Sequence, residues 1–177
     1  LDSSHGRATA ELSFPMITLG EAKYTNGEIH IPVSLDRIPY AVDCFFNSFT
    51  MTYVFEADKL TYVRTDDGIL KAEDAVLGKD YAVSGKIAYV NKNSDSGKTD
   101  GDIRSTGVMF TLVFVPADPA TTGTTSVVSG NVEVGNRLEQ TSTDFISSGT
   151  TVDFSKYVSV AEPKINITPV VKEDGVT

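Results

Sequence analysis

The sequence has no tryptophan, a single cysteine and no long apolar run, and each absence excludes a class of protein. Cys44 alone cannot form an internal disulfide framework or a cysteine-based zinc site. Because it adjoins Phe45 and Phe46, we expect it to be a small buried residue. No stretch approaches the roughly 20 apolar residues that a membrane-spanning helix needs. The composition therefore gives no reason to expect membrane insertion.

Positive charge is also scarce, since 15 Lys and Arg stand against 24 Asp and Glu, for a net charge of −9. Binding to nucleic acid or to an anionic membrane needs a basic patch, so neither is an expected partner. No phosphate loop or cofactor motif is present, and His5 and His30 lack the spacing of a Ser-His-Asp triad. We expect no cofactor on this chain and no small-molecule substrate.

Carboxylates occur in neighbouring pairs at Asp66-Asp67 and Glu73-Asp74. A glycosidase needs two carboxyl groups facing one cleft at about 5–10 Å, which neighbours in sequence rarely do. We interpret these pairs as turn residues and predict that the protein is not an enzyme.

What the sequence has in abundance is short alternating segments between turn signals, the pattern of an all-β sandwich or barrel. In residues 29–35 the apolar side chains alternate, and Pro32 predicts an edge or an irregularity. The most apolar segment, residues 108–115, predicts a central strand buried on both faces. Further strands are expected at residues 81–84, 87–91 and 127–134 and near Phe145. Residues 69–78 allow at most one or two helical turns.

One strand, at residues 48–55, carries large and small side chains on opposite faces. One face has the core-forming residues Phe49, Met51, Tyr53 and Phe55. The other has Ser48, Thr50, Thr52 and Val54, which are small and uncharged. Solvent-facing strands usually carry charges that prevent unwanted pairing, so this neutral face predicts covering by another protein.

Three segments resemble, in order, motifs of cohesin domains, the modules of bacterial cellulosome scaffoldins. The segment Ile31-Pro32-Val33-Ser34-Leu35-Asp36-Arg37-Ile38-Pro39 is similar to the family's early strand and Pro turn. Phe55-Glu56-Ala57-Asp58-Lys59-Leu60 resembles its aromatic-Asp-Pro-Asn-x-Leu turn, with Glu-Ala in place of Asp-Pro. Gly107-Val108-Met109-Phe110 and Asp144-Phe145-Ile146-Ser147-Ser148-Gly149 are similar to its later strand and closing motif.

The resemblance implies a nine-stranded β-sandwich with jelly-roll topology over residues 13–153. Residues 1–12 are then a linker or an expression remnant, and residues 154–177 a linker or a loosely docked strand. It also implies a secreted or cell-surface module that binds a dockerin module in cellulosome assembly. The dockerin carries the calcium, and the cohesin needs none for its fold.

Family binding surfaces use one sheet face, so the resemblance and the neutral face select the same strand. We expect Ile87, Tyr89 and Asn91 to point outward beside it, and Leu138 matches a family position that contacts the partner. The predicted partner-binding residues are Ser48, Thr50, Thr52, Val54, Ala82, Ser84, Ile87, Tyr89, Asn91, Asn93 and Leu138.

Alternatives remain at two points. A carbohydrate-binding module on a related jelly roll would need a strip of exposed aromatic residues, whereas a structural or adhesin sandwich would leave the neutral face unexplained. Residues 91–102 superficially resemble a calcium loop, but Asn91 opens it and Ser96 replaces the sharp-turn glycine. We interpret that stretch as a solvated hairpin loop.

Overall fold

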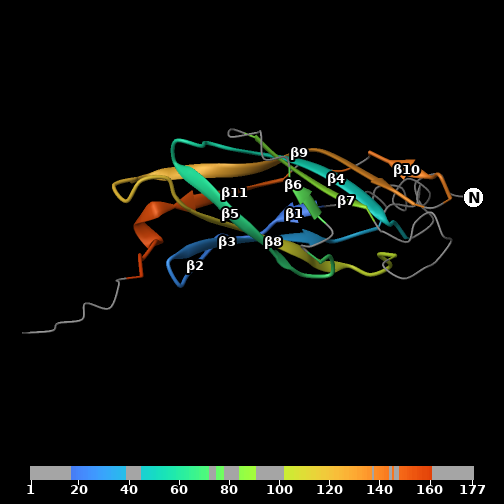
Figure 1. Ribbon diagram of the computed structural model, residues 1–177, viewed down its shortest axis with the longest axis horizontal. Helices are drawn as coiled ribbons and strands as arrows, with labels where there is room; N and C mark the ends of the chain where they lie inside the picture. Colours follow the sequence, from blue (N-terminus) through green and yellow to red (C-terminus); the bar gives the residue numbers. More distant parts are fainter. Residues whose placement is uncertain are drawn as a thin grey trace, which may run out of the picture.

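The chain forms two antiparallel β-sheets stacked as a sandwich, as the sequence predicted (Figure 1). The computed structural model describes residues 17–38, 45–71, 75–77, 84–90, 102–136, 138–143, 145 and 148–160. Within these residues the five-stranded sheet contains β1 (Ile17–Leu19), β2 (Lys23–Thr25), β3 (Glu28–Leu35), β8 (Gly107–Pro116) and β5 (Leu60–Asp67). The six-stranded sheet contains β10 (Thr141–Ser142), β9 (Thr124–Gly135), β4 (Ser48–Phe55), β7 (Ser84–Val90), β6 (Ala75–Leu77) and β11 (Gly149–Asp153).

The described residues thus form eleven strands rather than the expected nine. The difference comes from short segments that share a neighbour. Both β1 and β2 pair with β3, and both β10 and β11 pair with the long strand β9, which runs along the length of the molecule in Figure 1. Apart from β-structure, the described part contains one 3₁₀ turn, η4 (Phe154–Lys156), and no helix there is long enough to cross a membrane.

Strict alternation of apolar residues defines the core side of both sheets. In β3, the inward residues Ile29, Ile31 and Val33 are fully buried. In β4, Phe49, Met51, Tyr53 and Phe55 are all at most 6% exposed, which confirms the predicted register of that strand.

Aromatic rings join the two sheets across the core. Phe55 of β4 meets Phe114 of β8 edge-on, with the ring centroids 5.2 Å apart, and Tyr53 stacks on Phe55 at 5.8 Å. Such pairs add about 0.5–1.5 kcal/mol to the burial of their area. The prediction that β8 is central is also confirmed, because it lies between β3 and β5.

Pro32 does not lie on an edge strand, although its strand is irregular as predicted. On one side β3 pairs with β2 through His30 and with β1 from Val33 onward, so Pro32 lies opposite the gap between these two strands. Its carbonyl accepts from Gly20 N at 2.8 Å, and a register shift follows at Val33/Ser34. The missing N–H of Pro32 therefore leaves no ladder position unfilled.

The upper limit of one or two helical turns in residues 69–78 is respected, since the described part of that stretch contains none. Ala75–Leu77 forms β6 and pairs with β7. A strand was expected near Phe145, and Phe145 lies between β10 and β11. Cys44 lies outside the described residues.

The segment after β11 packs against the sandwich. Phe154 is 6% exposed, and the Tyr157 hydroxyl donates to the Gly27 carbonyl at 2.8 Å. Asp153 accepts from Ser155 N and so caps η4.

Candidate functional site

The outer surface of the six-stranded sheet is centred on the predicted row of β4. Ser48, Thr50 and Thr52 are half-buried there and Val54 is 45% exposed, with no charged residue in the row. Residues paired directly across an antiparallel ladder share a face. The register therefore adds neighbours on both sides: Val90 and Gly135 beside Ser48, Ala88 and Glu133 beside Thr50, Lys86 beside Thr52, and Val128 beside Val54.

We call this surface the neutral face and define it by the outward residues of the three strands β7, β4 and β9. They are Lys86, Ala88, Val90, Ser48, Thr50, Thr52, Val54, Thr124, Ser126, Val128, Asn131 and Glu133. Three valines on it (Val54, Val90 and Val128) are between 41% and 58% exposed. Exposed valines near threonines give this surface both apolar and hydrogen-bonding groups.

Ile87 and Tyr89 were wrongly predicted to point outward. Ile87 is fully buried and Tyr89 is 5% exposed, because β7 pairs them with the core residues Met51 and Phe49. The sequence contained a signal for the correct register. A lysine is almost never fully buried without a partner, so an outward Lys86 requires an inward Ile87.

The remaining predicted residues are distributed as follows. Ser84 is the first residue of β7 and pairs with Val54. Leu138 is 50% exposed in the turn between β9 and β10. Ala82, Asn91 and Asn93 lie outside the described residues.

The turn that carries Leu138 is held by one side chain. The Asn136 Oδ1 atom accepts from Leu138 N at 3.0 Å and from Gln140 N at 3.1 Å, while Asn136 Nδ2 donates to Gln140 Oε1 at 2.6 Å. Glu139 adopts a left-handed conformation, with φ of 61°. These bonds fix the backbone beside an exposed leucine, so little conformational freedom would be lost if Leu138 entered an interface.

A hollow of about 670 Å³ lies in the middle of the neutral face. It is lined by Thr50, Thr52, Lys86, Glu133 and Phe145, among others. Its origin is a bulge in β9, where Gly130 and Asn131 are both exposed and the register to β4 shifts between Met51 and Tyr53.

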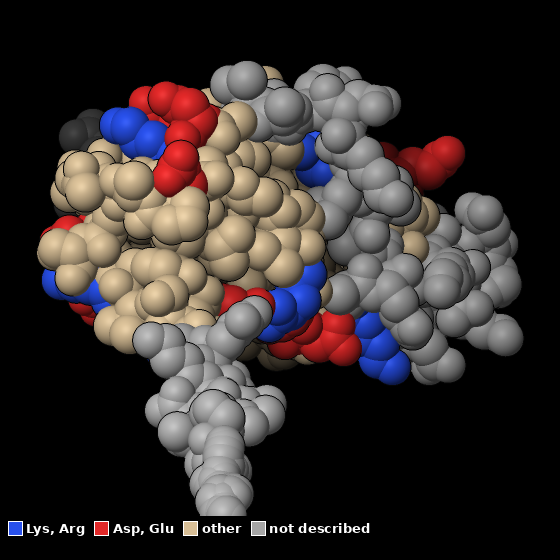
Figure 2. Space-filling model, turned by 60° about the vertical axis from the view of Figure 1, so that its left-hand side comes forward, with Lys and Arg blue, Asp and Glu red and all other residues tan. Residues whose placement is uncertain are grey.

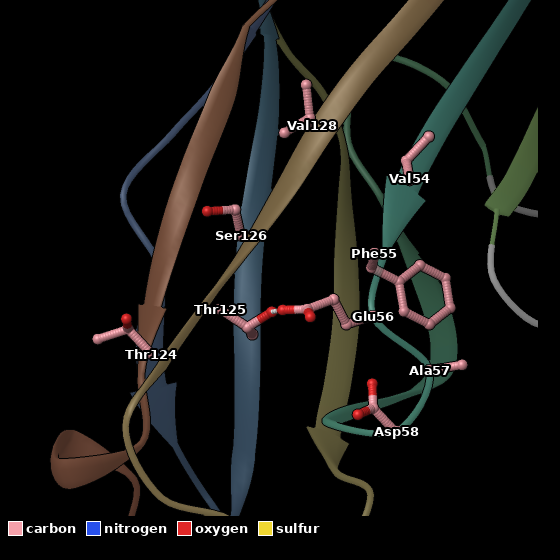
Figure 3. A pocket seen from close by; sticks show the side chains of 9 residues that line it. All are labelled: Val54, Phe55, Glu56, Ala57, Asp58, Thr124, Thr125, Ser126 and Val128. Atoms are coloured by element: carbon pink, nitrogen blue, oxygen red, sulfur yellow. Dashed lines mark hydrogen bonds between the residues drawn. The ribbon is translucent and has the colours of Figure 1, made fainter.

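A second hollow, of about 680 Å³, lies at the end of the same face, between the end of β4 and the start of β9 (Figure 3). Val54 and Val128 lie at one side of it, and the Glu56 carboxylate accepts from the Thr125 hydroxyl at 2.5 Å between the two strands. This hydrogen bond, with Lys59 at 3.5 Å, lowers the pKa of Glu56. The carboxylate therefore stays ionised and joins the β4–β5 turn to β9.

The outer surface of the five-stranded sheet is different, because a network of paired charges joins β3 and β5 there. The Arg64 guanidinium donates to both Glu28 oxygens and, through Nε, to Asp66 Oδ1 at 2.7 Å, while His30 lies 3.1 Å from Glu28. The hydrogen bond from Arg64 lowers the pKa of Glu28 to about 2. Val113, which is paired with both His30 and Arg64, is fully buried. The charges of Glu28, Arg64 and Asp66 are therefore paired within this surface.

Figure 2 shows one side of the molecule, where Lys and Arg lie next to Asp and Glu in small mixed clusters separated by uncharged areas. Within the described residues, no group of three His, Cys, Asp or Glu side chains could hold a metal ion. Of the loop at residues 91–102, the structure describes only Asp102. Glu73 and Asp74 also lie outside the described residues. Asp66 and Asp67 are the last residues of β5 rather than turn residues, and Asp66 accepts from Arg64 Nε.

Comparison with known proteins finds its matches among solved structures. No protein-family model matches the chain, and no curated protein sequence matches it. The sixth cohesin of scaffoldin B from Acetivibrio cellulolyticus, solved with a mutant Cel5 dockerin, is 19% identical with a TM-score of 0.58, over 77% of this chain and 95% of that one.

Two further structures agree. A type I cohesin from Clostridium thermocellum in complex with a dockerin gives 13% identity and a TM-score of 0.61, over 82% of this chain and 95% of that one. A cohesin from Clostridium acetobutylicum, solved in solution, is 14% identical with a TM-score of 0.62, over 81% of this chain and 93% of that one. The chain therefore has the cohesin fold, a jelly-roll sandwich.

Proposed function

We propose that this cohesin-fold chain is a non-catalytic module that binds a dockerin module of another protein through its neutral face. Several of the similar structures are cohesins solved together with dockerins. The observation that carries the proposal is the contrast between the two outer surfaces. One sheet carries paired charges across β3 and β5, whereas the other has an uncharged row on β4 with an exposed valine on each neighbouring strand.

The neutral face is large enough to form the centre of such an interface. Its three strands, about 4.8 Å apart, and seven residues at about 3.4 Å each span roughly 14 by 24 Å. That area, about 340 Å², is a little under half of the ~800 Å² that each partner buries in a standard interface, so neighbouring strands and turns must contribute the rest. Leu138 beside it, and Val54 and Val128 around the end hollow, supply apolar contacts, while Thr50 and Thr52 supply hydroxyl groups at the centre.

The carbohydrate-binding alternative requires exposed aromatic rings, and the described residues do not supply them. Sugar binding on a jelly roll needs exposed aromatic rings on which sugars stack. Every aromatic residue that the structure describes is buried or half-buried. A purely structural sandwich would give no reason for the neutral face.

We further infer that the module acts outside the cell, in the assembly or surface attachment of polysaccharide-degrading enzymes. This inference follows from the scaffoldins in which such modules occur, and a cohesin from one scaffoldin is among the similar structures.

The proposal is tested by solid-phase binding of the full chain to a panel of purified dockerins, with calcium and with chelator. We expect at least one dockerin to bind and its binding to be lost in chelator, because the dockerin depends on its metal for folding. The melting temperature of this chain alone should stay unchanged in chelator. Binding to cellulose without any dockerin binding would contradict the proposal.

A further inference from the structure

Two side chains of opposite charge lie on the otherwise uncharged centre of the neutral face. Lys86 of β7 pairs in register with Thr52, and Glu133 of β9 pairs with Thr50. Both are exposed, and both line the central hollow. They therefore lie on opposite sides of β4 and on the same surface.

The backbone geometry sets their separation. They are two strand spacings apart across the sheet and two residues apart along it, which places their Cα atoms roughly 12 Å from each other. Among the described contacts, neither Lys86 nor Glu133 has a hydrogen bond or an ion pair. On the other sheet, by contrast, Arg64 and Glu28 pair directly.

An unpaired charge at the centre of an interface is unfavourable, because it loses water without gaining a partner. A protein that covers this face must therefore offer groups for both charges. A negative group is needed near Lys86 and a positive group near Glu133, at a matching separation.

We propose that Lys86 and Glu133 determine which dockerin binds and in which orientation, by pairing with an acidic and a basic side chain of the partner. This rests on the proposed function. A partner turned by 180° about the normal to the sheet would bring like charges together, so the pair selects one orientation. The hollow between the two side chains leaves room for the partner's groups to enter.

The test uses a dockerin that binds the unmodified chain in the chelator-sensitive assay. Its affinity is measured by calorimetry at low and high salt for Lys86→Glu, Glu133→Lys and the double variant Lys86→Glu/Glu133→Lys. The double variant keeps the net charge of −9, so any change in its affinity comes from the positions of the two charges and not from the net charge of the chain. Lys23→Glu in β2 and Glu21→Lys beside it are matched controls, because both residues are exposed and lie away from the neutral face.

We expect each single reversal to weaken binding about tenfold or more at low salt and less at high salt. The double variant exchanges the two charges and so matches a partner turned by 180°. It should therefore bind more tightly than either single variant, and the controls should stay within about twofold. All variants should melt as the unmodified chain does, since the changes are on the surface.

Different failures identify different errors. If the reversals stay within twofold while Thr50→Arg abolishes binding, the neutral face is the interface and the charge proposal is wrong. If no dockerin binds at all, the proposed function fails and this inference with it. Self-association of the chain that either reversal abolishes would assign the two charges to a second copy, and would also overturn the proposal.

Discussion

The phenol ring of Tyr53 lies where a side chain on Gly85 would project, so these two cross-strand partners share one space on the core side of the six-stranded sheet. A Cβ atom at Gly85 would lie 1.9 Å from Tyr53 Cζ and 2.2 Å from its hydroxyl oxygen. Such distances are far below van der Waals contact. The glycine is therefore what allows β7 to pair with β4 beside a buried tyrosine.

Gly85→Ala should lower the free energy of unfolding by about 1–3 kcal/mol, the range for overpacking a core. Urea denaturation would measure it. Gly130→Ala is the matched control, because its Cβ would meet Thr52 O at an ordinary 3.4 Å and the site is exposed. Equal stability of the two variants would contradict this account of Gly85.

The register of β4 predicts opposite outcomes for two adjacent substitutions. Thr50→Arg places a charge on the outer surface and should change stability by no more than about 0.5 kcal/mol. Met51→Arg buries a charge in the core and should unfold the chain. Circular dichroism and thermal melting of both variants check this, and a folded Met51→Arg beside an unfolded Thr50→Arg would place the strand one residue out of register.

Tyr89→Ala should destabilise the fold by about 3 kcal/mol, because it empties a buried aromatic site. Its neighbour Val90 is 58% exposed, so Val90→Ala should leave stability within about 0.5 kcal/mol. Chemical denaturation distinguishes the two. If Tyr89→Ala were as stable as Val90→Ala, the inward assignment of Tyr89 would be incorrect.

The contact between Glu28 and Arg64 should make stability pH-dependent in the acid range. The folded pKa of Glu28 is lowered from 4.5 to about 2 by the hydrogen bond from Arg64. Its stabilising contribution is therefore complete above pH 4.5 and is lost as the pH falls towards 2. Glu28→Gln should be less stable than the unmodified chain at pH 6 and should lose less stability between pH 4.5 and 2. Melting temperatures across this range measure both effects, with Glu133→Gln as the control at an exposed carboxylate. Parallel curves for Glu28→Gln and the unmodified chain would contradict the assignment.

The sequence predicted the fold and the register of β4 because large and small residues alternate there without interruption. The prediction for β7 was wrong, because Ile87 and Tyr89 suit either a core or an interface. Lys86 favours the inward side for Ile87, and pairing with Met51 and Phe49 places both residues there. The hollow in the neutral face depends on a bulge at Gly130 and Asn131, and a bulge is a property of two paired strands. The ion pair between Glu28 and Arg64 also could not be predicted, because the two residues are 36 positions apart in the sequence and meet only when their strands join the same sheet.

The most direct test of the central claim, that the neutral face binds a dockerin, is calorimetry of one binding dockerin with three forms of the chain. They are the unmodified chain, Thr50→Arg at the centre of the face, and Thr61→Arg at an exposed position of β5 in the other sheet. The account predicts that Thr50→Arg weakens binding by about 2 kcal/mol or more, whereas Thr61→Arg binds as the unmodified chain does. Normal binding by a folded Thr50→Arg, or loss of binding by Thr61→Arg alone, would contradict it.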